Sequence, residues 1–258
     1  MTTARGRQAM PVRIIPRLDI KSPNLVKGIQ LEGLRVMGDP AEHALRYYGD
    51  GADELLYVDI VASLYERSSL SGLVGETASR IFVPLTVGGG IRTLDDFATM
   101  FRSGADKMAI NTGAIRDPGI LTKASRAYGA QAVVLSIEAK RQGASWEAYT
   151  DNGREHTGLD VIEWCRKAVD LGAGEILLTS VDREGTRKGF DLELITAVSR
   201  AVAIPIIACG GAGSVDHITA AIDAGADAIA IATLLHYKNL TIPGLKADLR
   251  GRGYTVRP

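Results

Sequence analysis

Two carboxylate side chains stand at the ends of apolar, β-branched runs, in places suited to acid and base chemistry. Asp19 ends the run 12–19, and Glu138 ends the run 132–138. Two carboxylates in different surroundings can divide the roles of general acid and general base. Residues 20–24 (Ile-Lys-Ser-Pro-Asn) do not start a helix, so Asp19 is a poor candidate for a simple helix cap. We therefore expect Asp19 and Glu138 to form a catalytic pair.

Duplicated glycine and hydroxyl sets predict two phosphate-binding cradles. Glycines occupy 88–90 and 210–211, each at the end of an apolar run. Because glycine has no Cβ, backbone N–H groups there can approach an anion, and nearby hydroxyl groups can donate as well. The alternative is that these glycines only make tight turns. The candidate residues are Gly90, Asn111 and Thr112 in one set, and Gly185, Gly211, Ala232 and Thr233 in the other. Two such sets predict a long substrate with a phosphate at each end.

At the opposite rim, four of the predicted strands have a charged residue at or next to their start, two basic and two acidic. Such a set could be a stabilising ring of ion pairs or a plug across one end of the molecule. The four residues are Arg13, Glu54, Lys107 and Glu175.

The elements that must position these side chains are eight short apolar runs separated by segments of helical period. The runs are apolar on both faces, as parallel strands covered by helices must be. Helical patterns such as 95–104, 158–172 and 216–225 lie between them and end in glycine. The sequence predicts an α/β fold, a (β/α)₈ TIM barrel, whereas a doubly wound sheet would usually have fewer strands. The predicted strands are 12–19, 54–59, 83–90, 107–111, 132–138, 175–180, 204–211 and 228–233.

An internal repeat favours the barrel. The segment VPLTVGGGIRTLDDFATMFRSGADKMAINT begins at Val83, and IPIIACGGAGSVDHITAAIDAGADAIAIAT begins 121 residues later at Ile204. The same offset relates the segments beginning at Gly51 and Gly172. Two halves of four βα units predict a doubled half-barrel with twofold symmetry. Active sites of such barrels lie at the carboxyl ends of the strands, where Asp19 would face its partner carboxylate.

Composition sets the remaining expectations. We expect a flexible tail at 1–11 and a single barrel domain at 12–258. Hydrophobic residues make up 46% and charged residues 23%, the balance of a soluble globular protein. Thirty basic and thirty acidic residues give no general attraction to nucleic acid or to a membrane surface. Two cysteines without metal-ligand spacing, and no secretory segment, predict a cytoplasmic protein with no metal and no cofactor.

Several specific motifs occur together along the chain. They are KG (27–28), GDP (38–40), DELLYVDIVAS, TVGGGI, GADKMAINT, EAKR, GAGEILLTSVDREGT and PIIACGGAG. With these motifs the chain resembles, from Val12 to its end, the cyclase subunit of imidazole glycerol phosphate synthase, the HisF type.

The resemblance implies a (β/α)₈ barrel that receives ammonia from a glutaminase subunit (HisH-like) at its N-terminal face. The ammonia would pass up the barrel and attack a bis-phosphorylated ribulosyl aminoimidazole carboxamide ribotide, giving imidazole glycerol phosphate and an aminoimidazole carboxamide ribotide. Asp19 and Glu138 would be the catalytic pair, and Lys27 a loop lysine that helps to close the site. The implied phosphate-binding residues are Gly90, Asn111, Thr112, Glu184, Gly185, Gly211, Ala232 and Thr233. The charged set Arg13, Glu54, Lys107 and Glu175 falls on the ammonia gate, and Asp106 on the glutaminase interface.

The chain departs from the family pattern at a few positions. Glu138 and Glu184 stand where the family has Asp, and Arg17 stands where it usually has a small residue. A paralogue that supplies ammonia for sugar amidination in surface-polysaccharide biosynthesis would retain phosphate anchoring and the gate in this way. A further alternative is a non-catalytic scaffold that activates a glutaminase. A sugar isomerase of the same barrel type has no obvious need of the charged set.

Overall fold

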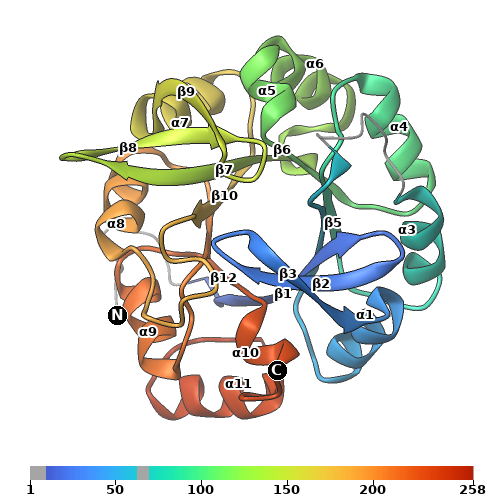
Figure 1. Cartoon of the computed structure of the whole chain (residues 1–258), viewed down its shortest axis with the longest axis vertical. Helices are drawn as coiled ribbons and strands as arrows, with labels where there is room; N and C mark the ends of the chain where they lie inside the picture. The colour runs from blue at the N-terminus through green and yellow to red at the C-terminus, as the bar shows by residue number, and fades with distance from the viewer. Residues whose placement is uncertain (1–9, 63–69, 258) are drawn as a thin grey trace.

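Eight parallel strands close into a barrel in the computed structural model, which describes residues 10–62 and 70–257 (Figure 1). The last strand pairs with the first and β10 pairs with β7, so the strands form one closed circle. This architecture confirms the predicted (β/α)₈ TIM barrel. Each predicted run overlaps one strand, but β1 and β7 extend two and four residues beyond the predicted runs 12–19 and 132–138. The barrel strands are β1 (Arg13–Lys21), β4 (Leu55–Asp59), β5 (Leu85–Gly88), β6 (Lys107–Ile110), β7 (Val133–Gln142), β10 (Glu175–Ser180), β11 (Ile206–Cys209) and β12 (Ala228–Ile231).

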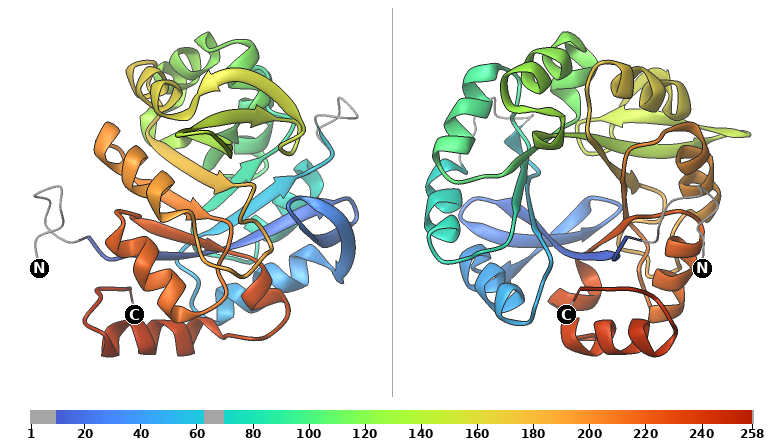
Figure 2. Two further views of the ribbon diagram at one scale, coloured as in Figure 1. Left: turned by 60° about the vertical axis from the view of Figure 1, so that its left-hand side comes forward. Right: turned by 180° about the vertical axis from the view of Figure 1, so that it is seen from behind.

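Helices surround the strands on all sides, as the view from behind in Figure 2 shows. Polar caps fix where several of them begin. Asp39 and Asp160 cap α1 and α7, and Thr93 and Ser214 cap α4 and α9, because each side chain accepts a backbone N–H of the first helical turn. The helices are α1 (Pro40–Gly49), α3 (Ser71–Ala78), α4 (Leu94–Arg102), α5 (Thr112–Arg116), α6 (Gly119–Tyr128), α7 (Val161–Asp170), α8 (Leu192–Ala201), α9 (Val215–Asp223), α10 (Thr233–His236) and α11 (Ile242–Gly251). Among the described residues, no helix is long and apolar enough to cross a membrane.

Alternation along each strand divides the buried side chains into two layers. On β1, Ile14 and Leu18 belong to the large core between strands and helices, whereas Ile15 belongs to a smaller cluster that holds one or two residues from most of the strands. This smaller cluster fills the middle of the barrel. Its buried members are Ile15, Leu56, Ala109, Val134, Leu177, Ile207, Cys209, Ala228 and Ala230.

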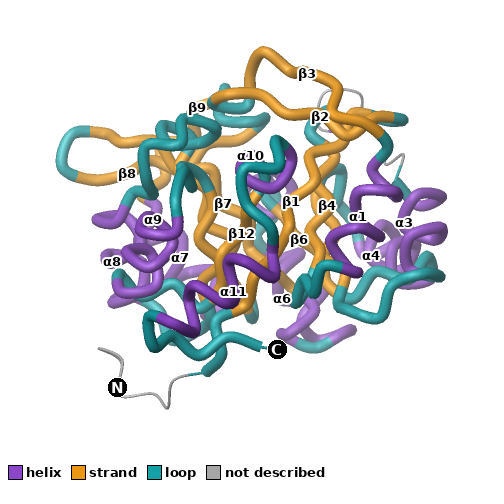
Figure 3. The backbone as a smooth tube through the Cα atoms, turned by 90° about the horizontal axis from the view of Figure 1, so that it is seen from below, coloured by secondary structure: helices purple, strands orange, loops and turns teal. Residues whose placement is uncertain are grey.

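Two β-hairpins extend from the barrel, one after β1 and one after β7, and both lie at the same end of the molecule (Figure 3). Their strands are β2 (Asn24–Ile29), β3 (Glu32–Gly38), β8 (Ser145–Thr150) and β9 (Glu155–Asp160). The 121-residue repeat includes them. Gln30 and Leu31 turn the first hairpin with positive φ, and Asp151 and Asn152 do the same in the second. The repeat is therefore a property of the backbone as well as of the sequence.

Candidate active site at the barrel mouth

The predicted catalytic pair lies where β1 and β7 leave the barrel and continue into their hairpins, two residues before the end of β1 and four before the end of β7. Asp19 pairs with Val58 of β4, and Glu138 pairs with Thr179 of β10. Val58 and Thr179 are 121 residues apart, so the two carboxylates hold corresponding positions in the two halves although they are themselves 119 residues apart. The register thus places the pair as the sequence predicted, on β1 and β7 at the same end of the barrel.

The first predicted phosphate set lines one cavity together with Glu138. The cavity is bounded by residues at the ends of β4, β5 and β6 and by β7. At Gly89, φ is +93° and a Cβ would lie 2.2 Å from the carbonyl oxygen of Asp59, so only glycine fits there. Arg92 and Arg116 also line the cavity and add positive charge. Its wall includes Gly90, Asn111, Thr112, Ser136, Glu138, Asp151 and Asn152.

The second predicted set lines a separate, smaller cavity. Gly211 adopts φ +107°, and a Cβ there would lie 2.2 Å from the carbonyl oxygen of Gly189. The wall includes Glu184, Gly185, Gly211, Ala232 and Thr233. The structure therefore brings each predicted set together, in two cavities on different sides of the barrel mouth.

The first hairpin is tied to the loop that follows β10. The ammonium group of Lys27 on β2 lies 2.6 Å from Oε1 of Glu184 and 3.9 Å from Oδ2 of Asp19. The backbone N–H of Gln30 donates to the carbonyl oxygen of Glu184 at 3.0 Å. Lys27 and Glu184 are 2% and 3% exposed. The hairpin is thus held closed over the mouth by a buried ion pair and by a backbone hydrogen bond.

Asp19 is held in its ionised form by neighbouring cations. Burial opposes ionisation, but the charges of Arg17 and Lys27 outweigh it and lower the pKa of the Asp19 carboxyl below its ordinary value. Nε of Arg17 donates to Oδ1 of Asp19 at 2.8 Å. Asp19 is therefore an ionised carboxylate and is free to accept a proton, although its lowered pKa makes it a weak base.

Glu138 has the opposite bias. Burial raises the pKa of its carboxyl to about 7, and the hydrogen bond from the N–H of Gly153 at 2.8 Å offsets this only in part. Near neutral pH a large share of Glu138 therefore carries a proton, which suits it to the role of acid. The two carboxylates thus hold corresponding positions in the two halves of the barrel, but their surroundings shift their pKa values in opposite directions.

A buried histidine, His236, lies near Asp19. His236 on α10 contacts the hydroxyl of Tyr47 through Nδ1 at 2.7 Å. Burial lowers the pKa of His236 to about 4, although the charge of Asp19 opposes this shift. The imidazole is therefore neutral at physiological pH.

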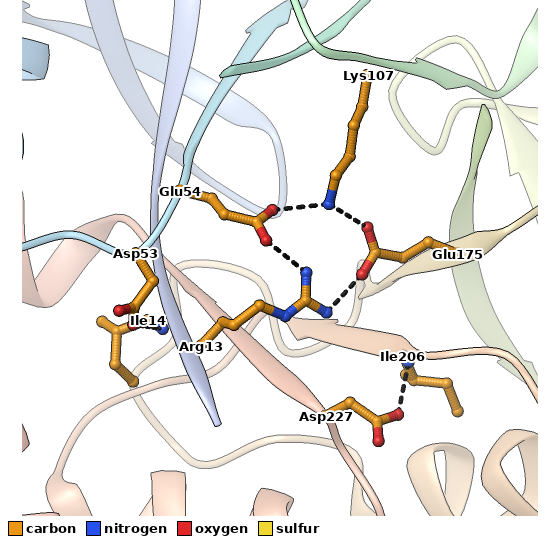
Figure 4. Close-up of polar contacts among 8 residues, drawn as sticks. All are labelled: Arg13, Ile14, Asp53, Glu54, Lys107, Glu175, Ile206 and Asp227. Carbon is orange, nitrogen blue, oxygen red and sulfur yellow. Dashed lines mark hydrogen bonds and ion pairs between the residues drawn. The ribbon is translucent and has the colours of Figure 1, made fainter. Parts of the chain in front are cut away.

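At the opposite end of the barrel the four predicted charged residues form a closed ring (Figure 4). Arg13 lies 2.7 Å from Glu54 and 2.5 Å from Glu175. Lys107 lies 3.0 Å from each of the same two carboxylates. The four side chains thus form a ring of ion pairs, one of the two interpretations of this set, and its role as a gate stays a prediction. The members lie at the N-terminal ends of β1, β6 and β10 and directly before β4.

Asp106, the predicted interface residue, is exposed and has a local partner. Its carboxylate accepts the N–H of Leu85 at 2.8 Å. Asp227 does the same for Ile206 at 2.8 Å, 121 residues further on (Figure 4). This contact ties neighbouring strands together in both halves, and it leaves the predicted partner contact of Asp106 a prediction.

Several residues at the site were not assigned from the sequence. Arg92, Arg116, Ser136 and Asn152 line the first cavity. A usable signal existed only for the segment Asp151-Asn152-Gly153, whose residue types favour a tight turn. Arg92 and Arg116 follow strand ends at distances where any polar residue is common.

Comparisons with known proteins show the family to which this chain belongs. A family model described as "Histidine biosynthesis protein" matches residues 13–241. The chain is 60% identical over 207 residues to a Legionella pneumophila protein named imidazole glycerol phosphate synthase subunit HisF, covering 80% of this chain and 98% of that protein. It is 51% identical to the protein of the same name from Myxococcus xanthus, covering 95% and 97% of the two chains. The corresponding Mycobacterium tuberculosis protein is 46% identical, covering 98% and 97%.

Proposed function

Since this chain belongs to the histidine biosynthesis protein family and is similar to HisF subunits over most of its length, we propose that it is the cyclase subunit of imidazole glycerol phosphate synthase. In this role it uses ammonia to convert a bis-phosphorylated ribulosyl aminoimidazole carboxamide ribotide into imidazole glycerol phosphate and an aminoimidazole carboxamide ribotide. The observation that carries the proposal is the twofold site, in which two corresponding carboxylates accompany two separate glycine-lined cavities.

Each end of the substrate has a matching cradle in this proposal. One phosphate binds in the first cavity to backbone N–H groups near Gly90 and to Asn111 and Thr112, with Arg92 and Arg116 balancing its charge. The other phosphate binds in the second cavity near Gly211 and Thr233. A substrate held at both ends presents its middle to the carboxylates, which reduces the entropic cost of reaching the reactive geometry.

Asp19 and Glu138 divide the proton transfers. Addition of ammonia to the ribulosyl ketone leaves an extra proton on the nitrogen, and loss of the carbonyl oxygen as water requires a proton on that oxygen. Asp19 accepts the first proton because Arg17 and Lys27 keep it ionised. Glu138 delivers the second because burial keeps it largely protonated near pH 7.

The ammonia enters from the opposite end of the barrel. A glutaminase subunit docks at the N-terminal face, where Asp106 forms part of the contact surface. The ring of Arg13, Glu54, Lys107 and Glu175 then acts as the gate that ammonia must pass. Lys27 closes the hairpin over the bound substrate.

Turnover by the isolated subunit tests the proposal. The bis-phosphorylated ribotide is incubated with ammonium salts at alkaline pH, where unprotonated ammonia is abundant, and imidazole glycerol phosphate is quantified. Product formation is the expected result, with Asp19→Asn as the inactive reference. No product at high enzyme concentration would contradict the proposal. Binding of the ribotide without turnover would point instead to a related reaction. If the ribotide did not bind at all, the result would point to a non-catalytic scaffold that activates a glutaminase.

A further inference from the structure

Arg17 is a buried cation inside the barrel. The residue is 4% exposed. Its Nε donates to Asp19 on its own strand, while Nη1 donates to Oγ1 of Thr179 on β10 at 3.1 Å and to Sγ of Cys209 on β11 at 3.4 Å. Because β12 lies between β1 and β11 in the sheet order, the side chain reaches across the inside of the barrel to make these contacts. Three strands therefore fix the position of one guanidinium group.

The internal repeat shows that the barrel itself does not require this arginine. Arg17 pairs with Leu56 of β4, and Ser136 pairs with Leu177 of β10. Leu56 and Leu177 are 121 residues apart, so Ser136 is the counterpart of Arg17 in the second half. The same place in the same kind of strand is thus filled by a small hydroxyl side chain.

The difference between Arg17 and Ser136 makes the two halves of the site chemically unequal. In the second half, Ser136 lines the larger cavity beside Glu138. In the first half, the guanidinium of Arg17 contacts Asp19, and neither residue lines either of the two cavities. Two carboxylates at corresponding positions therefore differ in having a cation or a hydroxyl group two residues before them.

We propose that Arg17 is a positioning residue that holds Asp19 ionised and in a fixed orientation as the base of the reaction. The inference rests on the proposed cyclase function. It assigns Arg17 no contact with the substrate. Arg17 acts on Asp19 by direct contact and on Glu138 only through its charge.

Geometry supports this role in two ways. First, the planar guanidinium is held by Thr179 and Cys209, so it presents Nε to Oδ1 of Asp19 in a fixed direction and fixes the carboxylate orientation. Secondly, Lys27 stands 3.9 Å from Oδ2, beyond hydrogen-bond distance, so Arg17 makes the shorter contact with this carboxylate.

The other charged and titratable groups around the pair are few. Asp19 faces Lys27 from β2 and His236 from α10, in addition to Arg17 from its own strand. Arg17 itself faces Asp19, Cys209 and Glu184. Around Glu138 the groups are Arg17 and Asp151. Since burial disfavours the charge of both carboxylates, loss of the guanidinium shifts both of them toward the protonated form.

The test is the pH profile of kcat/KM for the ribotide at a constant concentration of unprotonated ammonia. In Arg17→Gln we expect the acidic limb to move up by about one pH unit or more, with a KM within about threefold of the wild type. Arg17→Lys keeps the charge without the planar fork and should shift the limb less. Arg141→Gln, an exposed arginine outside the site, should leave the profile unchanged.

A uniform loss of rate at every pH in Arg17→Gln, with the limbs in place, would overturn the inference, because it would mean that the side chain only fills space. If the glutamine variant does not fold, the Lys variant carries the comparison. If the wild type itself does not turn over the ribotide, the proposed function fails and the inference is judged separately. In that case carbon-13 NMR titration of the Asp19 and Glu138 carboxyl groups in the wild type and Arg17→Gln measures the same effect without substrate. Unmoved titrations would then overturn the inference.

Discussion

The ammonium group of Lys27 lies 2.6 Å from a carboxylate oxygen of Glu184, a residue 157 positions further along the chain. One residue belongs to the hairpin after β1, the other to the loop after β10, and both are buried. The contact therefore joins the hairpin over the barrel mouth to the side of the mouth that holds the second cavity. A substrate that reaches both cavities must pass under this contact or open it.

Removal of the Glu184 charge should loosen the hairpin. In Glu184→Gln we expect the amides of residues 24–38 to exchange hydrogen at least about tenfold faster, since a hydrogen bond to a charged group contributes roughly 1.5–3 kcal/mol. Hydrogen exchange followed by mass spectrometry measures this. Glu193→Gln is the matched control, because Glu193 also pairs at 2.6 Å, with Arg141, but is exposed. Equal exchange in the two variants would show that the ion pair does not hold the hairpin.

Loss of the proposed base should abolish the chemistry and spare binding. We expect Asp19→Asn to lower kcat for the ammonia-dependent reaction by about a hundredfold or more while KM for the ribotide changes little. Steady-state kinetics with ammonium salts measures both. Asp182→Asn serves as the control, because Asp182 is an exposed carboxylate near the same rim that accepts the N–H of Arg141. A similar loss of kcat in both variants would remove the special role of Asp19.

The raised pKa of Glu138 predicts a pH-dependent cost to stability. The folded carboxyl has a pKa of about 7 against an ordinary value of 4.5, so the folded state binds the proton more tightly than the unfolded state. Stability is then lost as pH rises from 4.5 through 7, by an amount on the order of 3 kcal/mol. We expect Glu138→Gln to be more stable than the wild type at pH 8 and about equal to it near pH 4.5.

Urea unfolding at both pH values checks this expectation. The contribution of His236 to the stability of the protein changes in the other direction. It is lost as pH falls from 6.5 toward 4, because folding lowers the pKa of His236. That contribution is common to the wild type and to Glu138→Gln and cancels in their difference. A glutamine variant that is less stable at pH 8 would contradict the burial argument.

The charged ring should depend on all four of its members. In Lys107→Met, Glu54 and Glu175 keep only Arg13 between them, and we expect a loss of about 3 kcal/mol in the free energy of unfolding. If the ring is also the ammonia gate, the ratio of glutamine-dependent to ammonia-dependent turnover should fall in the complex with the glutaminase. An unchanged ratio with lowered stability would leave the ring a purely structural element.

Much of the barrel could be predicted from the sequence because its strands are buried on both faces. Continuous apolar runs and the 121-residue offset identify them without any knowledge of contacts. The hairpin strands gave no such signal. β3 is exposed along most of its length and β9 along half of its length, so neither shows the alternation of apolar and polar residues that marks a half-buried strand.

The site divides along the same line. Residues at strand ends, such as Asp19 and Gly211, could be placed because the barrel fixes where every strand ends. Contacts across the barrel could not be predicted from the sequence. Arg17 is two residues from Asp19 in the sequence, but its bonds to Thr179 and Cys209 exist only once the sheet has closed. The different pKa directions of Asp19 and Glu138 likewise depend on such long-range neighbours.

The bridge between Val12 and Val256 gives the chain the topology of a ring. The N–H of Val12 donates to the carbonyl oxygen of Thr255 at 2.8 Å, so the first barrel strand is joined to the segment that follows the last helix. Each half of the ring starts with a long strand and its hairpin. Which half comes first in the chain therefore depends only on where the chain termini are placed. A circularly permuted chain that begins near Gly129 would retain every strand neighbour and both cavities.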